Sequence, residues 1–232
     1  MDEEDLSIRI LDVATTGKEA KRGGQELLLR TTRGDIYCAF HQSSQPQAGV
    51  VWVSGARGNI AGPADGMYGR LAEQFMATGI TSLRVGQRQP GVLEEAVMDT
   101  LAGVSFLKGL GYARVALVGH SFGGAVVIAA APFSPEVVAV AALSSQTYGA
   151  QQVAQVSPRP LLLVHGELDE RLSSECSVLI HQWARDPKEL VIMEGAGHAL
   201  MEVKDQLDAL LGRWLADKLP ANTRPSAGGE LP

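Results

Sequence analysis

The sequence has few of the features that mark specialised classes of protein. Only two of its 232 residues are cysteines, Cys38 and Cys176, and neither belongs to a C-x-x-C pair. A disulfide framework and a zinc site are therefore not indicated. We interpret both cysteines as structural, with Cys38 in a strand and Cys176 in a helix.

Long apolar runs and clusters of basic residues are also missing. No apolar run approaches the roughly 20 residues of a membrane span, and the opening MDEEDLSIRI is acidic where a signal peptide is basic. We therefore expect no membrane span and a cytoplasmic location. The net charge of −6 comes from interspersed acids and bases, so nucleic acid is not an expected partner.

The residues that are plentiful are those of an ordinary globular protein, with 45% hydrophobic residues and 26 glycines. The chain suits one domain, because a single core grows to about 250 residues before chains tend to divide. We predict this domain over residues 26–217. The polar segment 1–25 is expected to be irregular, and the segment 218–232, rich in Pro, Gly and Ser, is expected to be a flexible tail.

From residue 26 onward, short β-rich runs alternate with helical patterns. The runs read ELLLRT, DIYCAF, VVWVSG, ITSLRV, RVALVG, VVAVAAL, PLLLVHG and ELVIM. The first two are separated by Arg33-Gly34-Asp35, which fits a hairpin turn, whereas most later runs are separated by helix-length segments. We therefore predict an α/β fold, a three-layer α/β/α sandwich whose eight-stranded sheet is mostly parallel and is antiparallel at its first edge.

The segment RVALVGHSFGGAVVIAAA reads as a buried strand, a sharp turn and an Ala-rich helix. The turn, Gly119-His120-Ser121-Phe122-Gly123, matches G-x-S-x-G, in which glycines let strand and helix approach closely and the serine is strained. This pattern is weak alone and gains weight from its position between a strand and a helix. We predict that Ser121 is a nucleophile.

A serine hydroxyl is a poor nucleophile at neutral pH and needs a base, which in turn needs an acid. In strand–turn–helix sites, the acid and then the histidine follow the serine along the chain. His41 and His120 come too early. His165 ends a strand, and His181 lies in a pattern typical of a surface helix. His198 follows the last strand in the glycine-rich loop EGAGHAL, and we predict that it is the base.

The acid is predicted in PLLLVHGELDERL, where Glu167, Asp169 and Glu170 follow a strand. Asp169 is preferred because it stands three residues after the glycine that turns the chain. The end of the preceding strand, residues 143–146, contains no carboxylate. We therefore predict that Asp169 supports the base.

Together, GHSFGG, HGELDERL and EGAGHAL resemble the nucleophile elbow, acid segment and histidine loop of the α/β-hydrolase superfamily, over about residues 26–217. The chain is similar to small serine esterases without a cap and to dienelactone hydrolases, because only SSQTYGAQQVAQVSPRP stands where many relatives insert a cap domain. The resemblance implies an oxyanion hole made by the backbone N–H groups of Phe122 and Ala56. The usual His-Gly pair is replaced by Ser54-Gly55, which we expect to alter the support of this loop.

Without a cap, the cleft is expected to be shallow and open. Arg57, Tyr148 and Leu172 are the candidate residues for contact with a substrate. Arg57, and likewise Arg84 and Arg88 from a later loop, could meet an acidic group of the substrate, although solvated arginines are the more ordinary interpretation.

Three functions fit these residues. The first is a carboxylesterase that acts on short or medium acyl esters through an acyl-Ser121 intermediate, without a metal or an organic cofactor. The second uses the same residues on other bonds, as an acyl thioesterase, a lactonase or a small peptidase. The third is a non-catalytic, protein-binding domain of the same fold, and the reactivity of Ser121 distinguishes it from the first two. The expected partner is a small ester or thioester, and no protein partner is indicated.

Overall fold

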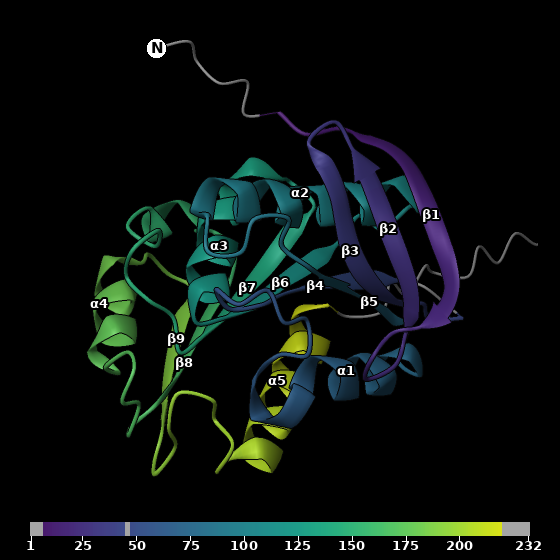
Figure 1. Cartoon of the computed structure of the whole chain (residues 1–232). Coiled ribbons are helices and arrows are strands. Elements are labelled where there is room, and N and C mark those ends of the chain that lie inside the picture. The colour runs from purple at the N-terminus through teal and green to yellow at the C-terminus, as the bar shows by residue number, and fades with distance from the viewer. Residues whose placement is uncertain (1–6, 45–46, 220–232) are drawn as a thin grey trace, which may run out of the picture.

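The structure, a computed structural model, describes residues 7–44 and 47–219. These residues form a nine-stranded sheet with helices on both faces (Figure 1). The strands are β1 (Ile10–Glu19), β2 (Gln25–Thr31), β3 (Gly34–His41), β4 (Ala48–Val53), β5 (Ile80–Val85), β6 (Val115–His120), β7 (Val137–Leu143), β8 (Leu161–Gly166) and β9 (Lys188–Met193). The helices are α1 (Pro63–Met76), α2 (Leu93–Gly109), α3 (Phe122–Ala130), α4 (Glu175–Trp183) and α5 (Lys204–Lys218), and short 3₁₀ turns occupy Ala131–Phe133 and Val153–Gln155.

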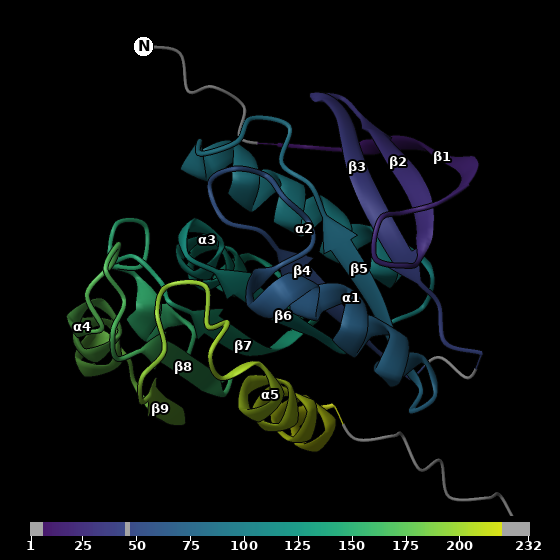
Figure 2. The ribbon, with the colours of Figure 1, turned by 60° about the horizontal axis from the view of Figure 1, so that its bottom comes forward.

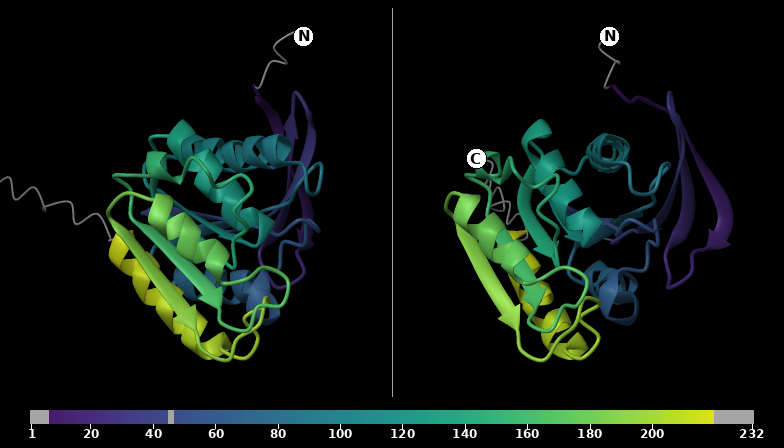
Figure 3. Two further views of the ribbon diagram at one scale, coloured as in Figure 1. Left: turned by 90° about the vertical axis from the view of Figure 1, so that its left-hand side faces the viewer. Right: turned by 60° about the vertical axis from the view of Figure 1, so that its left-hand side comes forward.

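The sheet is parallel except at its N-terminal side. Its strand order is β1-β2-β3-β5-β4-β6-β7-β8-β9. Neighbours from β1 to β5 pair in antiparallel fashion, and from β5 to β9 every neighbouring pair is parallel. The predicted hairpin joins β2 to β3, with Thr31 opposite Gly34. The predicted mixed α/β sandwich is therefore confirmed, and Figures 1 and 3 show β1, β2 and β3 turned away from the parallel strands.

Each face of the sheet carries its own hydrophobic core. Helices α2, α3 and α4 cover one face, and α1 and α5 lie side by side on the other (Figure 2). Strands β4 and β5 are buried along their whole length, as expected of parallel strands covered on both faces. On the α1 face, Trp52 packs against Tyr68 and Phe75, with ring centroids 5.0 and 6.3 Å apart. These cores fix the carboxyl ends of the parallel strands, where the site lies.

The described residues contain one strand more than the eight predicted, because β1 lies in the segment 1–25 that was expected to be irregular. Most β1 residues are exposed, so ILDVATTGKE has no alternation of apolar and polar residues to reveal a strand. Backbone hydrogen bonds to β2 along one edge stabilise it instead. At the other end, α5 continues through Lys218, and residues 1–6 and 220–232 of the two predicted terminal segments lie outside the described residues.

Other predictions about the chain can be compared with the structure directly. The segment between β7 and β8, residues 144–160, carries a 3₁₀ turn and no α-helix, so the predicted lack of a cap at this position is confirmed. Cys38 lies in β3 and Cys176 in α4, as predicted, and both are free thiols. Among the residues described, none of the helices combines the length and apolar character needed to cross a membrane.

Candidate active site

Ser121 occupies the turn between the last residue of β6, His120, and the first residue of α3, Phe122. Its backbone has φ 58° and ψ −120°, a conformation that costs a residue with a side chain about 1–3 kcal/mol. The N–H of Ser121 donates to the carbonyl oxygen of Leu143 at 2.8 Å, which ties the turn to the end of β7. The serine hydroxyl is thus held at the carboxyl edge of the parallel strands.

Two glycines allow this turn to pack. A Cβ atom on Gly119 would lie 2.0 Å from the carbonyl oxygen of Gly123, and one on Gly123 would lie 2.4 Å from that of Ser54. Both distances are far inside van der Waals contact, so neither position has room for a side chain. The β6–α3 turn and the end of β4 therefore meet backbone to backbone.

The structure brings together the three residues predicted as nucleophile, base and acid. His198 Nε2 lies 3.1 Å from Ser121 Oγ, and His198 Nδ1 lies 2.7 Å from Asp169 Oδ2. Because a carboxylate only accepts hydrogen bonds, Nδ1 carries the proton and Nε2 faces the serine hydroxyl as an acceptor. The Asp169 side chain is fully buried, whereas that of His198 is 14% exposed. This arrangement can take a proton from Ser121.

Asp169 is surrounded by hydrogen-bond donors. Its Oδ1 accepts from the N–H groups of Arg171 and Leu172 at 2.8 and 2.9 Å, and its Oδ2 accepts from His198 and, at 3.1 Å, from His165. Burial alone would raise the pKa of Asp169, but the Leu172 N–H, the His198 ring and the Arg171 N–H outweigh it and lower the pKa below its ordinary value. The carboxyl group is therefore charged at neutral pH.

His120 supports the loop that carries His198. Its Nε2–H donates to the carbonyl oxygen of His198 at 2.9 Å, and the two rings lie 4.9 Å apart between centroids. Burial lowers the pKa of His120 to about 4, so the ring is neutral and acts as a donor. His120 comes too early in the chain to be the base, but its adjacency to Ser121 in the sequence is a signal that it lies close to the site.

A glutamine braces the loop that follows β4. Gln87 Nε2 donates to the carbonyl oxygens of Ser54 and Gly55 at 2.9 and 3.3 Å, and the N–H of Gly58 closes a turn onto the same Gly55 oxygen. The Ser54 side chain is buried, and its hydroxyl has no hydrogen-bond partner among the described residues. The loop support that was expected to change at Ser54 thus comes from Gln87, a residue that the sequence analysis missed.

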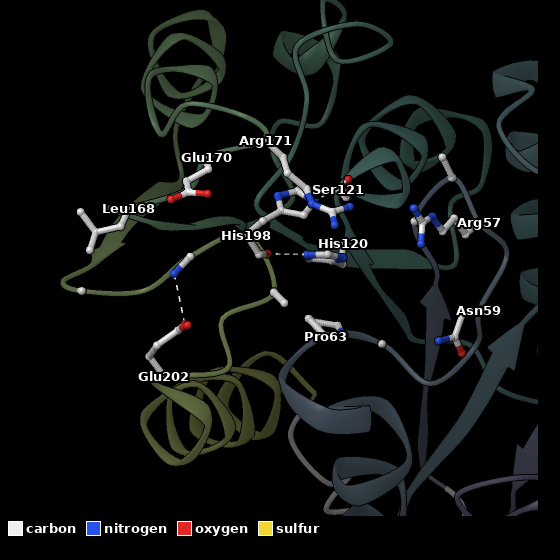
Figure 4. Close-up of a pocket in the computed structure, with 16 residues that line it drawn as sticks. Arg57, Asn59, Pro63, His120, Ser121, Leu168, Glu170, Arg171, His198 and Glu202 are labelled. Carbon is white, nitrogen blue, oxygen red and sulfur yellow. Dashed lines mark hydrogen bonds between the residues drawn. The ribbon is translucent and has the colours of Figure 1, made fainter.

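A pocket of about 740 Å³ opens in front of Ser121 and His198 (Figure 4). Its charged wall residues are Arg57, Glu170, Arg171 and Glu202. Its apolar wall residues are Ala56, Pro63, Leu168 and Ala199. Within the described part of the chain, no group of His, Cys, Asp or Glu side chains is arranged to hold a metal ion. The pocket is open, and its wall combines apolar surface with charged groups of both signs.

The structure agrees only in part with the predicted pocket residues. Ala56 and Arg57 lie on the wall, but Tyr148 and Leu172 do not. Tyr148 is 65% exposed on the segment between β7 and β8. Leu172 instead directs its backbone N–H and carbonyl groups to Asp169 and His165.

Arg84 and Arg88 also lie away from the pocket. Arg84 is fully buried and donates to the carbonyl oxygens of Lys21 and Gly23. Arg88 forms an ion pair with the buried Asp99. Their contacts hold the residues before β2 and the loop before α2.

The chain resembles known proteins in two respects, its family profile and its fold. The profile of the dienelactone hydrolase family matches residues 64–215. No curated protein matches the chain in sequence.

Solved structures share the α/β-hydrolase fold of this chain. A dienelactone hydrolase from Anabaena variabilis has a TM-score of 0.72 at 17% identity, over 81% of this chain and 94% of that one. A serine hydrolase without a lid from Xanthomonas campestris has a TM-score of 0.71 at 19% identity, over 88% and 99% of the two chains. Est1E from Butyrivibrio proteoclasticus has a TM-score of 0.70 at 16% identity, over 79% and 94%, and a structure of Est1E with bound ferulic acid is also similar.

The glycine packing at the turn predicts opposite effects for two alanine substitutions. Gly123→Ala forces a Cβ atom against the Ser54 carbonyl oxygen, and we expect a loss of about 3 kcal/mol in unfolding free energy. Gly212→Ala, inside α5 with no atom within 4 Å of the new Cβ, should add about 0.5–1 kcal/mol. Thermal denaturation of both variants checks this, and an unchanged Tm for Gly123→Ala would contradict the packing described.

Proposed function

The chain belongs to the dienelactone hydrolase family, and we propose that it is a serine hydrolase that cleaves carboxylic esters through an acyl intermediate on Ser121. The observation that carries the proposal is the continuous contact from Ser121 through His198 to the buried Asp169, at 3.1 and 2.7 Å. A serine that only formed a turn would need neither contact. The strained backbone of Ser121 supports the same proposal, because such strain is frequent at functional sites.

In the proposed reaction, Ser121 Oγ attacks the ester carbonyl carbon while His198 Nε2 takes the hydroxyl proton. The resulting tetrahedral oxyanion collapses, the ester C–O bond breaks, and the imidazolium returns the proton to the leaving alcohol. Water then attacks the acyl-serine, His198 again accepts the proton, and the carboxylic acid leaves as Ser121 regains its hydrogen. Asp169 stabilises the imidazolium without itself taking the proton.

The backbone N–H groups of Phe122 and Ala56 are the proposed oxyanion donors, each worth about 3 kcal/mol in comparable sites. Phe122 begins α3, so its N–H has no acceptor within the helix. The loop that carries Ala56 runs beside the nucleophile, since a Cβ atom on Gly55 would lie 3.6 Å from Ser121 Cβ. The two donors would then face one point next to Ser121 Oγ.

The wall of the pocket favours short, polar acyl groups over long alkyl chains. The guanidinium groups of Arg57 and Arg171 point into the pocket in Figure 4. The apolar side chains are small or, like Leu168, 60% exposed. An alkyl chain in this pocket therefore removes little apolar surface from water. Thioesters and lactones use the same chemistry, and a substrate panel separates them.

Labelling with a fluorophosphonate probe tests the proposed nucleophile. We expect one adduct on Ser121 in the wild-type protein, no adduct in Ser121→Ala, and labelling slowed by about 10³-fold or more in His198→Ala, because the base is missing. His181→Ala, on α4 and away from the pocket, is the matched control and should label like the wild type. Folded wild-type protein that does not react would remove the hydrolase proposal and favour a binding domain.

The small or exposed apolar side chains of the wall predict a flat dependence on acyl chain length. A fully buried methylene contributes about 0.8 kcal/mol, or about fourfold in kcat/KM, and we expect less than about twofold per methylene beyond the butyrate ester. Glu170→Leu, which extends the apolar surface beside Leu168, should increase kcat/KM for the hexanoate ester, whereas Glu19→Leu on β1 should not. Steady-state kinetics on p-nitrophenyl esters gives the answer, and a fourfold gain per methylene in the wild type would contradict the proposed pocket preference.

The brace on the loop after β4 predicts an effect on kcat. Gln87→Ala removes the donations to Ser54 and Gly55, so the proposed Ala56 donor loses its fixed position. We expect kcat to fall about 10- to 100-fold with little change in KM, because the oxyanion exists only during reaction. Gln155→Ala, at an exposed residue of the segment between β7 and β8, is the control. Equal kcat values for the two variants would exclude this role for Gln87.

A further inference from the structure

His165 is a buried histidine that belongs neither to the pocket wall nor to the three residues discussed so far. It lies in β8 with none of its surface exposed. Its Nδ1 lies 2.7 Å from the hydroxyl of Ser177, a fully buried residue of α4. Its Nε2 lies 3.1 Å from Asp169 Oδ2 and 2.9 Å from the Leu172 carbonyl oxygen. Both ring nitrogens are therefore engaged inside the protein.

These partners determine where the proton of the ring lies. The Leu172 carbonyl and the Asp169 carboxylate can only accept, so the proton is on Nε2 and is shared between them. Nδ1 is then an acceptor, and the Ser177 hydroxyl donates to it. Burial is the main cause that lowers the pKa of His165, and the lowered pKa keeps the ring neutral. The direction of each hydrogen bond from Ser177 to Asp169 is thereby fixed.

Two imidazole rings converge on one carboxylate oxygen. Asp169 Oδ2 accepts from His198 at 2.7 Å and from His165 at 3.1 Å, while Oδ1 accepts only backbone N–H groups. A carboxylate with donors on both oxygens cannot rotate without breaking several bonds. A second donor on Oδ2 also disperses part of the negative charge that His198 feels.

We propose that His165 is a positioning residue for Asp169, oriented by Ser177 and donating to the same oxygen that His198 contacts. The inference rests on the hydrolase function proposed above. The working unit is then a chain of five residues, Ser177, His165, Asp169, His198 and Ser121, that runs from the interior of α4 to the pocket. His165 does not touch the substrate; it acts through Asp169 on the orientation and proton affinity of His198.

Other titratable groups lie close to these five residues. Glu170, Arg171 and Glu202 line the pocket that His198 faces, and His120 and Cys176 lie nearer the interior. His120 faces His198 from β6 and is neutral, since its pKa is lowered to about 4 by burial. Cys176, a residue of α4, lies near Asp169. Burial raises the pKa of the Cys176 thiol, so the thiol is uncharged at neutral pH. His120 and Cys176 are therefore both uncharged near neutral pH.

A pair of substitutions at His165 tests the proposal. His165→Met keeps a similar volume without a donor, and His165→Gln restores an N–H group that can reach Asp169. For His165→Met we expect kcat/KM to fall about 10- to 100-fold, because the carboxylate stays in contact with His198 but orients its ring less precisely. The acid limb of the pH profile should move up by at least about 0.3 unit, because the less dispersed carboxylate charge holds a proton on His198 more strongly. His165→Gln should recover most of the kcat/KM and return the acid limb most of the way to its wild-type position.

A second measurement does not depend on turnover. Nuclear magnetic resonance of ¹⁵N-labelled histidine follows the titration of His198, which should occur at higher pH in His165→Met than in the wild type. Ser177→Ala is a smaller change and should shift this titration in the same direction by a smaller amount. It replaces His165→Met in the test if His165→Met does not fold. His181→Gln is the histidine control on α4 and should leave both readouts unchanged.

The outcomes separate the two proposals. Wild-type protein that neither reacts with a fluorophosphonate nor turns over esters defeats the proposed function, yet the titration of His198 still reports its coupling to His165. Lower activity in His165→Met with an unmoved acid limb and an unmoved His198 titration would make His165 a packing residue and overturn the inference. Wild-type activity in His165→Met would overturn it as well.

Discussion

The backbone contact between the end of β4 and the start of α3 is the constraint on which the rest of the site depends. Gly123 lies so close to the Ser54 carbonyl that a single added carbon atom would collide with it. This contact sets the direction in which Ser121 leaves the turn and the path of the loop that carries Ala56. Both follow from the sheet and its two cores, so the geometry of the site is a property of the packed domain and does not rest on loop conformation alone.

Around this frame, the electrostatics of the site centre on one buried negative charge. Two imidazole rings, those of His198 and His165, lie within hydrogen-bond distance of Asp169, and a third ring, that of His120, packs at a tilt against His198. Burial lowers the pKa values of His120 and His165, so these two rings serve as neutral donors. A cationic ring at either position would compete with His198 for the carboxylate. Neutral neighbours leave the attraction of Asp169 available to the one ring that meets the pocket.

Sequence patterns predicted the parts of the fold and site whose signals are local. Ser121 and Asp169 follow the buried strands β6 and β8, and His198 follows the more exposed β9. In each case, a run of apolar residues before a turn that contains glycine identifies the position. Strand β1 was missed because its stability comes from pairing with β2, and its exposed side chains carry no pattern. The number of strands was therefore wrong by one, while the order of β and α elements was right.

The supporting residues could not be found in this way because their roles depend on contacts between distant segments. Gln87 meets Ser54 from another loop, and His165 meets Ser177 from a helix, and neither pair has a characteristic spacing. Tyr148 and Leu172 lie away from the pocket wall for a related reason. Which way a loop side chain faces is decided by the hydrogen bonds of its backbone, and those of Leu172 are directed to Asp169 and His165.

The short connection between β7 and β8 has a consequence for the kinetics of the proposed reaction. Because no cap at this position has to open or close, substrate entry and product exit need no conformational step, and chemistry itself would limit turnover. The same openness would leave the proposed acyl-serine in contact with bulk water. Water, which is in large excess over alcohols and amines, would then be the favoured acceptor of the acyl group, and the proposed intermediate would proceed to hydrolysis instead of acyl transfer.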